Sequence, residues 1–600
     1  MSRASRARPD RRAIPRLGPR MGRRVQHRLQ TRIRVVFLLT AFCLSMFAAR
    51  LVQLQGVDAA AYAAMAADEH TRTVVLPAER GVIRDRDGEV LATSTDAVAL
   101  TADPTMTADE APVIASVLAR VVGLDYFRTV EVLRTPDTRF VWLRRQVPVW
   151  RADRAMQVLS RLEITGVFTQ RDPLRTYPAG AVAGNVVGFV DIDGTGIAGI
   201  ESVADRALHG ADGSATYMVA SSGATIPLTP STVQEPVQGS GLELTVDRDL
   251  QWYAGRQLAQ AILETGAESG TAVVTEVRTG EVLALAEWPT VDPNRPQLVA
   301  APDRGSRAVQ NVYEPGSVQK LLTFAALVDQ GLVTPRTRLK VPGSLRFDGH
   351  TVNDYWRHGT IRLTATGVLS KSSNLGTITA ARGLRADRLE PYLRGFGLGA
   401  ETGLGLPGES RGILAPASTW TDIGRATILF GQGLSVTAVQ MAAAVNAIAN
   451  DGVYVAPTLV RGTISPDGGV VPADGPDGRR VVSVRAAEQV QQMMEAVTAP
   501  TGTAPGAAIT GYRVAGKTGT AQRVTDAGGY DPHATVISFA GFAPADDPAL
   551  SMYIVLDDPA SGFGGGSGAG PVFHDVMSYA LHRYAVAPTG HRASPIRTSW

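Results

Sequence analysis

One uncharged apolar segment, preceded by an arginine-rich arm, constrains this chain more than any other feature. Residues 35–49 read VVFLLTAFCLSMFAA. As a helix they would rise only about 22 Å, whereas extension to Gln55 gives about 31 Å, enough to cross a hydrocarbon core of roughly 30 Å. Arg50 lies near the end of that span, where its long side chain can reach the lipid headgroups. We therefore predict a single transmembrane helix over residues 35–55.

The charge around this segment indicates its orientation. The formal net charge is +3, yet residues 1–34 alone contain twelve arginines and one acid, Asp10, so the remainder of the chain is acidic. Because basic residues favour the cytoplasmic side, we expect residues 1–34 to be a cytoplasmic tail and everything after about residue 56 to lie outside. The tail lacks the interleaved aromatic residues of a nucleic-acid binder, so a membrane is the expected partner and nucleic acid is not. A cleaved signal peptide is the alternative, because DAAAYAAMAA offers small residues for a cleavage site.

The 600 residues are too many for one hydrophobic core, and the sequence divides accordingly. Residues 56–220 are β-rich: TRTVVLPAERGVIRDRDGEVLATSTDAVAL alternates apolar and polar residues around a turn at Asp87 and Gly88, which is typical of a hairpin. Residues 221–241 are rich in Ser, Thr, Pro and Gly and are predicted as a linker. The single cysteine, Cys43, lies in the apolar segment. No intramolecular disulfide can form, so these regions must be stabilised by their cores.

Residues 242–586 combine strands and helices, and residues 587–600 form a short tail. LELTVDRDLQWYAGRQLAQAIL predicts a strand followed by a helix, and a strand pair follows around Thr279 and Gly280. Several amphipathic helices come next, and the region closes with strands and a helix near residues 576–584. Mixed elements of this kind indicate a multidomain α+β or three-layer architecture.

Lysine is rare in this chain, which draws attention to its positions. Of fifty-nine basic residues only four are lysines, at positions 320, 340, 371 and 517. Lysine, unlike arginine, can lose its proton in a protein. In YEPGSVQKLLTFAALVDQG, Lys320 follows Ser317 by three residues where a helix is predicted to begin, so both side chains share one helical face. A buried lysine with its pKa lowered by desolvation and by a nearby cation could take the serine proton. An ordinary exposed lysine is the alternative for this pair alone.

Two further short patterns follow in order. SKSSNLGTITAARGL contains Ser372-Ser373-Asn374, the only Ser-x-Asn in the chain, which supplies a hydroxyl that can relay protons and an amide that can hold a peptide. A helix N-cap is the alternative for this pattern, and the adjacent Lys371 is expected to be solvated. The third pattern is KTGT, from Lys517 to Thr520.

KTGT also belongs to a longer pattern that suggests a different function. Residues 511–518, GYRVAGKT, satisfy the phosphate-binding pattern G-x-x-x-x-G-K-[ST], and the apolar run MYIVLD ends at Asp557 as a magnesium-binding strand would. A P-loop, however, needs a strand before its glycines and a helix directly after Lys-Thr. Because loop-like residues precede Gly511 and Gly519 comes directly after Lys-Thr, we predict that YRVAGKTGTAQRV is a strand bent at its glycines, with SMYIVLDD as a neighbouring buried strand. A P-loop ATPase remains a remote alternative.

Ser-x-x-Lys, Ser-x-Asn and Lys-Thr-Gly, in this order, resemble the signature of penicillin-binding proteins and serine β-lactamases. The surrounding sequence is similar to class B penicillin-binding proteins of the division type over about residues 35–585, including ERGVIRDRDGEVLATS, YPAGAVAGNVVGFV, GIAGIESVADRALHG, GQGLSVTAVQMAAAVNAIANDG and SFAGFAPADDPAL. Gln319 departs from the family, which more often has an aromatic or aliphatic residue there. The resemblance implies an elongated β-rich pedestal, or dimerisation-type, domain at 56–220 and a transpeptidase domain at 242–586, with an antiparallel sheet flanked by helices.

The resemblance also implies roles for the first two motifs. Ser317 attacks the penultimate D-Ala carbonyl of a peptidoglycan stem that ends in D-Ala-D-Ala, and Lys320 takes its proton. Ser372 and Asn374 assist proton transfer and substrate placement. An amine of a diamino acid in a neighbouring stem then resolves the acyl-enzyme and forms a cross-link, whereas β-lactams stall at the acyl step.

The third motif is expected to hold the substrate. Lys517 and Thr518, with Gly519 and Thr520 in the same strand, bind the terminal carboxylate, and the backbone amides of Ser317 and Thr520 form the oxyanion hole. The division-type resemblance further implies contacts with a polytopic glycosyltransferase and other division proteins, through the membrane helix and the first domain.

Several alternatives stay open at this point. A D,D-carboxypeptidase, a β-lactamase or a β-lactam sensor uses the same motifs, although none needs so large a first domain, and a non-catalytic scaffold is a further possibility. The family needs no cofactor and no metal, and His350, His358, His533 and His574 are expected to be surface or core residues. The glycine-rich stretch at 561–571 resembles the flexible rim beside the family's active site, or is an ordinary loop.

Overall fold

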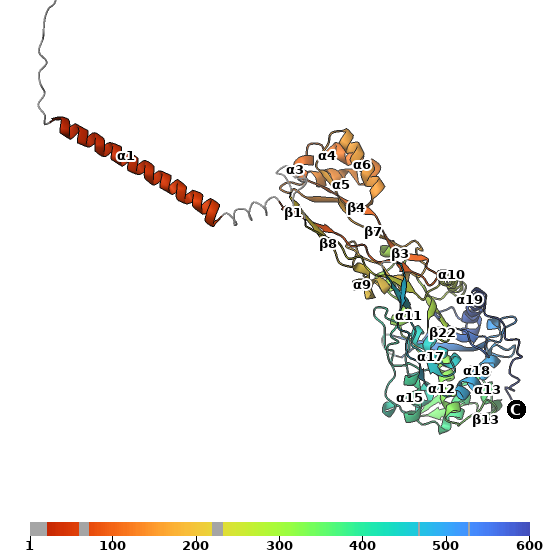
Figure 1. The fold of residues 1–600 in the computed structure, drawn as a ribbon. Helices are drawn as coiled ribbons and strands as arrows, with labels where there is room; N and C mark the ends of the chain where they lie inside the picture. The colour runs from red at the N-terminus through yellow and green to blue at the C-terminus, as the bar shows by residue number, and fades with distance from the viewer. Residues whose placement is uncertain (1–20, 59–70, 219–231, 466–467, 526–528) are drawn as a thin grey trace, which may run out of the picture. The chain divides into compact units, whose positions relative to one another are not determined.

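The computed structural model describes residues 21–58, 71–218, 232–465, 468–525 and 529–600 (Figure 1). The chain divides into two compact units. The first comprises residues 1–76 and 213–235, and the second comprises residues 77–212 and 236–600. Each is described by itself.

The first unit contains the apolar helix and a small sheet. Helix α1 (Met21–Val52) continues as a π-helical turn, Gln53–Val57. It begins well before the predicted span because no glycine or proline interrupts the chain between Gly22 and Gly56. Its stretch Thr31–Val57 has a mean hydropathy of 2.2 and, among the described helices, is the one long and apolar enough to cross a membrane. Strands β1 (Thr71–Leu76), β8 (Gly213–Met218) and β9 (Thr232–Gln234) form an antiparallel sheet, so part of the predicted linker is a strand.

A three-stranded sheet with helices on one face forms a separate core within residues 97–171. Strands β4 (Ala97–Ala102), β5 (Val141–Pro148) and β6 (Val167–Arg171) pair antiparallel with β4 in the middle. The core between this sheet and helices α4 (Ala111–Val121), α5 (Tyr126–Leu133) and α6 (Val149–Arg161) includes Leu100, Ile114 and Leu159. The short helix α3 (Pro104–Thr107) follows β4.

A six-stranded sheet joins the earlier and later parts of the second unit. Its order is β19-β18-β10-β2-β3-β7. Strands β2 (Ile83–Arg84) and β3 (Val90–Thr95) form the hairpin predicted around Asp87 and Gly88. They pair onward to β7 (Leu174–Thr176) and, on the other side, to β10 (Gly241–Leu244), β18 (Val460–Ile464) and β19 (Val470–Pro472). Segments more than 150 residues apart in sequence therefore share one sheet.

A buried ion-pair cluster lies beside this sheet. Glu201, from helix α8 (Gly199–Val203), is fully buried and accepts hydrogen bonds from Arg80 Nε at 2.6 Å and from Arg175 Nε at 2.7 Å. Arg80 also pairs with Asp205 of α9 (Asp205–His209) at 2.7 Å. Because a buried carboxylate is tolerated only when it is paired, these arginines tie the segments at residues 80, 175 and 201 together. The preceding helix α7 spans Gly184–Val187.

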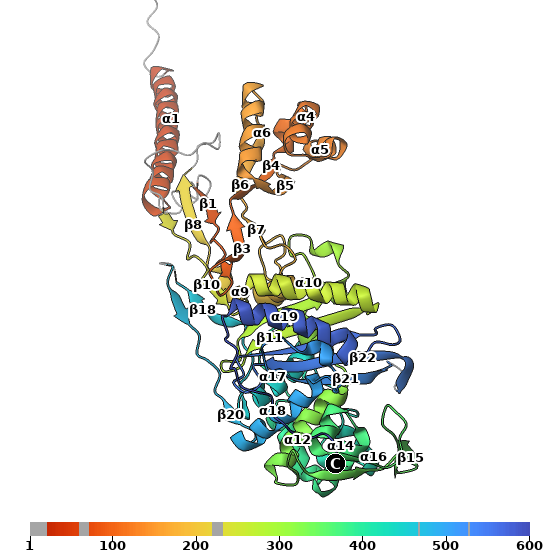
Figure 2. The ribbon, with the colours of Figure 1, turned by 90° about the vertical axis from the view of Figure 1, so that its right-hand side faces the viewer.

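The largest layer is a five-stranded antiparallel sheet with helices on both faces (Figure 2). Its order is β12 (Val282–Trp288), β11 (Ser269–Glu276), β23 (Leu550–Asp557), β22 (Tyr530–Ala543) and β21 (Ala515–Val524). Val274 of β11 faces helices α10 (Arg248–Thr265) and α19 (Gly570–Arg583), whereas Val273 belongs to the core shared with the helices on the other face. Coverage of both faces explains why β11 reads as a nearly continuous apolar run. The predicted antiparallel sheet flanked by helices is confirmed.

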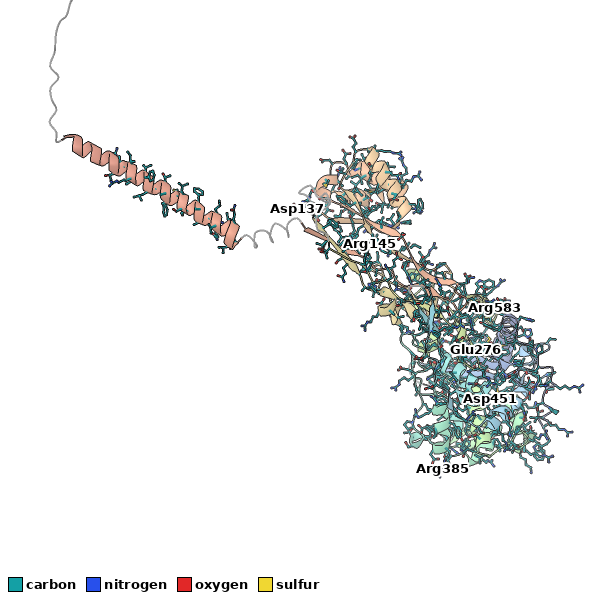
Figure 3. The ribbon with its side chains drawn as sticks, viewed as in Figure 1. Asp137, Arg145, Glu276, Arg385, Asp451 and Arg583 are labelled. Carbon is teal, nitrogen blue, oxygen red and sulfur yellow. The ribbon has the colours of Figure 1, made fainter. Side chains whose placement is uncertain are left out.

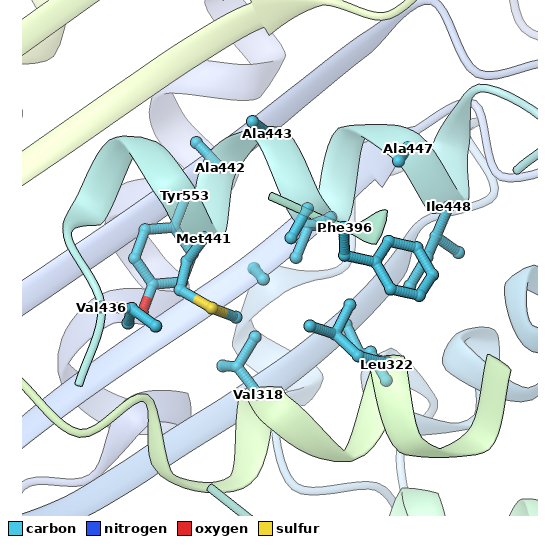
Figure 4. Close-up of a cluster of buried hydrophobic side chains, with 14 of the residues drawn as sticks. Val318, Leu322, Phe396, Val436, Met441, Ala442, Ala443, Ala447, Ile448 and Tyr553 are labelled. Carbon is cyan, nitrogen blue, oxygen red and sulfur yellow. The ribbon is translucent and has the colours of Figure 1, made fainter. Parts of the chain in front are cut away.

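The second face of the sheet is covered by a helical layer. Figure 4 shows its centre, where Val318 and Leu322 pack against Phe396 and against Met441 and Ile448 of helix α17 (Ala438–Ala449), with Tyr553 of the sheet alongside. Exposed charged side chains, such as that of Arg385, lie at the outer edge of this layer (Figure 3). The other helices and strands between β12 and β21 along the chain are α11 (Arg307–Gln310), α12 (Lys320–Asp329), α13 (Ala365–Ser370), α14 (Asn374–Ala380), α15 (Ala386–Gly395), α16 (Asp422–Ile428), α18 (Val484–Thr498), β13 (Arg338–Val341), β14 (Leu345–Phe347), β15 (His350–Val352), β16 (Ile361–Thr364), β17 (Val453–Tyr454) and β20 (Arg479–Arg480).

Candidate active site

Ser317 lies where a tight turn enters a buried helix. It sits in the 3₁₀ turn Gly316–Gln319, which leads directly into α12, so its predicted place in the first turn of a helix is confirmed. Gly316 has a φ of +54°, and a Cβ atom there would lie 2.7 Å from the carbonyl oxygen of Thr520. Only glycine accommodates both constraints. This turn therefore rests directly against strand β21.

Lys320 is fully buried and joins the first two motifs. Its Nζ donates hydrogen bonds to Ser317 Oγ at 2.9 Å, to the Ser372 carbonyl oxygen at 2.6 Å and to Asn374 Oδ1 at 2.7 Å. The alternative of an ordinary exposed lysine is wrong. A serine hydroxyl within hydrogen-bond distance of a buried amine is the arrangement that an activated nucleophile needs.

Residues 371–373 form the turn between α13 and α14, and Asn374 is the first residue of α14. Ser372 adopts a left-handed φ of +58°, which turns its hydroxyl toward both lysines: Lys320 Nζ is 3.3 Å away and Lys517 Nζ is 2.9 Å away. Ser373 is the N-cap of α14, where its Oγ accepts a hydrogen bond from the Gly376 amide. The helix-cap interpretation is confirmed for Ser373, whereas Ser372 has its hydroxyl next to both lysines and its role in proton relay stays a prediction.

Lys517 lies in strand β21, which excludes a P-loop at this position. The residues after it continue the strand with no helix, and Lys517 Nζ donates to the Thr518 carbonyl oxygen at 2.7 Å. Strand β22 lies between β21 and β23, so the prediction that SMYIVLDD neighbours the KTGT strand is wrong. Asp557, at the end of β23, pairs across β22 at Val536 and is not beside Lys517. The P-loop ATPase alternative is thereby rejected.

Burial dominates the electrostatics of the two lysines. Desolvation lowers the pKa of Lys320 to about 7, and the nearby Asp354 carboxylate opposes that shift. Desolvation also lowers the pKa of Lys517 well below its usual range, and the charge of Lys320 lowers it further. Both amines approach the Ser372 hydroxyl, so a proton on one disfavours a proton on the other. The sequence predicted that desolvation and a nearby cation would lower the pKa of Lys320, and burial is the main cause of the lowered pKa in the structure.

An open cleft with a volume of about 720 Å³ lies over these groups. Ser317, Ser372, Asn374, Thr518 and Thr520 line it, whereas Lys320 and Lys517 lie beneath its floor. The glycine-rich stretch contributes residues 562–567 to the wall, so the rim interpretation of that stretch is confirmed. The cleft therefore presents hydroxyl and amide groups on its surface and keeps both amines desolvated below.

Sequence reasoning missed part of this cleft. Tyr355, Phe430, Gln432 and Thr503 also line it, and Thr503 Oγ1 lies 3.1 Å from Thr518 Oγ1. They come from separate loops, and no local spacing brings them together. Asp354 and His358, buried behind the second motif, were also missed as a pair, although VNDYWRHG shows an acid and a histidine four residues apart.

No group of three or more His, Cys, Asp or Glu residues suitable for a metal ion occurs within the described ranges. Two of the histidines considered above, His350 and His533, are exposed, and His574 is half-buried, where its Nδ1 lies 2.7 Å from the Ala508 carbonyl oxygen. His358 is packed next to the cleft motifs, where it forms hydrogen bonds with Asp354 and with the Gly359 carbonyl oxygen and its ring contacts that of Trp356.

Comparisons with known proteins agree with this geometry. Residues 270–578 match the penicillin-binding protein transpeptidase domain, and residues 75–244 match the penicillin-binding protein dimerisation domain. The chain is 38% identical to penicillin-binding protein PbpB of Mycolicibacterium smegmatis, over 90% of this chain and 88% of the relative. It is 34% identical to the peptidoglycan D,D-transpeptidase FtsI of Escherichia coli, over 85% and 84%. Penicillin-binding protein 3 of Mycobacterium tuberculosis, solved with aztreonam, superposes with a TM-score of 0.69 at 34% identity, covering 88% of this chain and 100% of that one.

Proposed function

This chain belongs to the class B penicillin-binding proteins, and from that premise we propose how it cross-links peptidoglycan. It is a peptidoglycan D,D-transpeptidase that acts through a serine acyl-enzyme and binds β-lactams. The observation that carries the proposal is the contact of 2.9 Å between Ser317 Oγ and a fully buried Lys320 amine, at the floor of an open cleft.

In the acylation step, Ser317 Oγ attacks the penultimate D-Ala carbonyl carbon while neutral Lys320 takes the hydroxyl proton. The C–N bond to the terminal D-Ala then breaks, and that proton passes to the departing amine. Ser372 Oγ, 3.3 Å from Lys320 Nζ, offers a relay for this second transfer, and Asn374 Oδ1 orients the lysine. The pKa of about 7 supports this role because a substantial fraction of Lys320 is neutral at neutral pH.

The KTGT strand holds the substrate in this proposal. The Thr518 hydroxyl, which lines the cleft, binds the terminal carboxylate, and the buried Lys517 beneath it orients this hydroxyl and that of Ser372 by donating hydrogen bonds to both. The backbone amides of Ser317 and Thr520 stabilise the oxyanion. Position 519 requires a glycine for the close pairing of β21 with β22, because a Cβ atom there would lie 2.1 Å from Ser538 Oγ.

The acyl-enzyme is resolved by an amine of a second stem peptide. Its nitrogen attacks the ester carbonyl, Ser317 leaves as the hydroxyl, and a new amide bond cross-links the stems. Water as the acceptor would instead give a D,D-carboxypeptidase or a β-lactamase, and no turnover would give a β-lactam sensor. The relatives named as D,D-transpeptidases support the amine acceptor.

The acceptor is tested with full-length chain in detergent and uncross-linked peptidoglycan made in vitro. We expect cross-linked stem dimers that disappear in Ser317→Ala. Trimmed stems without dimers would instead identify a carboxypeptidase, and dimers that persist without Ser317 would overturn the mechanism.

The single apolar N-terminal helix fits a single-pass membrane protein. We further propose that residues 1–34 face the cytoplasm, and that the catalytic part works outside it with a polytopic glycosyltransferase and other division proteins in septal wall synthesis. The arginine asymmetry supports the orientation. Protease treatment of intact and of opened cells tests the orientation, since the N-terminal tail should be cut only after the cells are opened.

The proposed domain boundaries are 1–34 for the tail, 35–55 for the membrane anchor, 56–220 for the pedestal domain, 221–241 for the linker, 242–586 for the transpeptidase domain and 587–600 for the C-terminal tail.

A further inference from the structure

Two charged side chains that the mechanism does not use are buried behind the second motif. Asp354 and His358 lie between β15 and β16, their side chains are 0% and 6% exposed, and Asp354 Oδ2 lies 2.9 Å from His358 Nε2. A buried charge is costly unless it is paired and hydrogen-bonded, so the hydrogen-bond partners of the two side chains indicate which part of the site they stabilise.

The hydrogen bonds of Asp354 identify it as an ionised carboxylate. Its Oδ2 accepts from Ser373 Oγ at 2.6 Å, and its Oδ1 accepts from the Leu375 amide at 3.0 Å. Ser373 Oγ already accepts from the Gly376 amide, so its own proton points to Asp354. With the histidine contact, three donors converge on one carboxyl group, which is the environment that favours the charged form.

The hydrogen bonds of His358 identify it as the matching cation. Its Nε2 faces the Asp354 carboxylate, and its Nδ1 lies 2.6 Å from the carbonyl oxygen of Gly359. A carbonyl oxygen and a carboxylate both accept hydrogen bonds only, so both ring nitrogens are in position to donate. A histidine that donates from both nitrogens is the imidazolium.

This pair touches the catalytic motif on both sides of Asn374. The carboxylate binds the Ser373 hydroxyl on one side and the Leu375 amide on the other, and Asn374 Oδ1 between them accepts from Lys320 at 2.7 Å. Asp354 also acts on Lys320 through its charge, because a nearby anion stabilises the lysine in its protonated form. The pair therefore controls both the geometry and the potential at Lys320.

We propose that Asp354 and His358 form a buried carboxylate–imidazolium pair that positions Lys320 for proton abstraction. The carboxylate clamps the turn that carries Asn374, and the imidazolium offsets its negative charge, which would otherwise hold a proton on Lys320. Both are positioning residues, since neither lines the cleft. This inference rests on the role of Lys320 as the base in the proposed function.

Other charged or titratable groups near Lys320 are few in the part of the chain that the structure describes. Lys517 faces it from β21 across the Ser372 hydroxyl. Tyr355 and the exposed Lys371 line the mouth of the cleft. Partial burial raises the pKa of Tyr355, and the Asp354 charge raises it further, so this phenol stays neutral at neutral pH. Changes in the pair should therefore be felt mainly by Lys320 and Lys517.

The two members of the pair have opposite effects in this account. His358→Gln leaves the Asp354 carboxylate without its cation. The pH at which the acylation rate reaches half of its plateau, the acid limb of the profile, should then rise by about one unit, so that acylation at pH 6 becomes about tenfold slower. Asp354→Asn removes the anion and should move that limb down, even where the plateau rate falls through a looser turn. The double variant should lie near the wild-type position. A purely structural role would lower the rates without opposite shifts.

The test measures the second-order rate of acylation by a fluorescent penicillin from pH 5 to 9, with the full chain in detergent. The matched control is His350→Gln, an exposed histidine in the same segment, which should leave the profile unchanged. Shifts in one direction, or no shift in either variant, would overturn the proposal. A flat wild-type profile would overturn the role of Lys320 as base and this inference with it, whereas a normal wild-type limb with unshifted variants would overturn this inference alone.

A second measurement does not depend on variants that fold poorly. In wild-type chain labelled with ¹⁵N-histidine, one imidazole should carry a proton on both ring nitrogens, because both face hydrogen-bond acceptors. Its signal should be missing from His358→Gln. Absence of a doubly protonated imidazole that disappears in His358→Gln would contradict the assigned hydrogen bonds.

Discussion

Replacement of Lys320 by arginine gives the sharpest test of the base. At pH 7 a lysine with a pKa of about 7 is neutral in half of the molecules, whereas one at the ordinary 10.5 is neutral in about 0.03% of them. Burial therefore raises the concentration of the competent base about 1,600-fold. Arginine keeps its proton in any such site. Lys320→Arg should consequently lower the acylation rate by about three orders of magnitude, because it fixes a proton on the side chain that must accept one.

The assay is the rate of labelling by a fluorescent penicillin, followed on gels over pH 5.5 to 8.5. Because the neutral amine is the active form, the wild-type rate should rise with pH through about 7 and then level off. Lys371→Arg is the matched control, since that lysine lies exposed at the cleft and should keep the wild-type profile. Retention of more than a tenth of the rate in Lys320→Arg, or a wild-type rate that does not change with pH, would refute the reasoning.

Three further predictions concern packing. The Gln319 side chain is fully buried, yet neither of its amide atoms has a hydrogen-bond partner among the described residues. Gln319→Met should therefore raise the free energy of unfolding by about 1–2 kcal/mol in denaturant titrations. A lower denaturant midpoint for the variant would count against this prediction. Gly316→Ala should slow acylation at least about tenfold, because its Cβ would meet the Thr520 carbonyl oxygen at a left-handed φ; an unchanged labelling rate would show that the turn relaxes freely. Glu201→Gln leaves two buried arginines underpaired and should cost about 3–5 kcal/mol of stability in thermal unfolding, with acylation of the folded protein unchanged; an unshifted melting temperature would contradict it.

Local patterns were enough to predict the contact between the proposed nucleophile and the proposed base. Ser317 and Lys320 are three residues apart at the start of one helix, so their contact follows from helical geometry alone. The same holds for the hairpin at Asp87 and Gly88, where turn chemistry and alternation agree. In these cases the residues that make the feature are close in sequence.

Contacts between distant segments were beyond local patterns. Asp354 reaches Ser373 across 19 residues, and the intervening strand and helix fix their approach. Strand β21 is buried on both sides over most of its length, so no alternation revealed that Lys517 points beneath the cleft. The strand order of the five-stranded sheet, with β22 between β21 and β23, was also beyond local patterns, because the sequence of one strand does not identify the strand that pairs with it.

The most direct test of the central claim is the site of covalent attachment. Full-length chain is reacted with benzylpenicillin, digested and mapped by mass spectrometry. The account predicts one penicilloyl adduct, on Ser317, at a stoichiometry near one per chain, and none in Ser317→Ala. An adduct on Ser372 or Ser373, which also lie at the site, or no adduct on a folded chain, would contradict it.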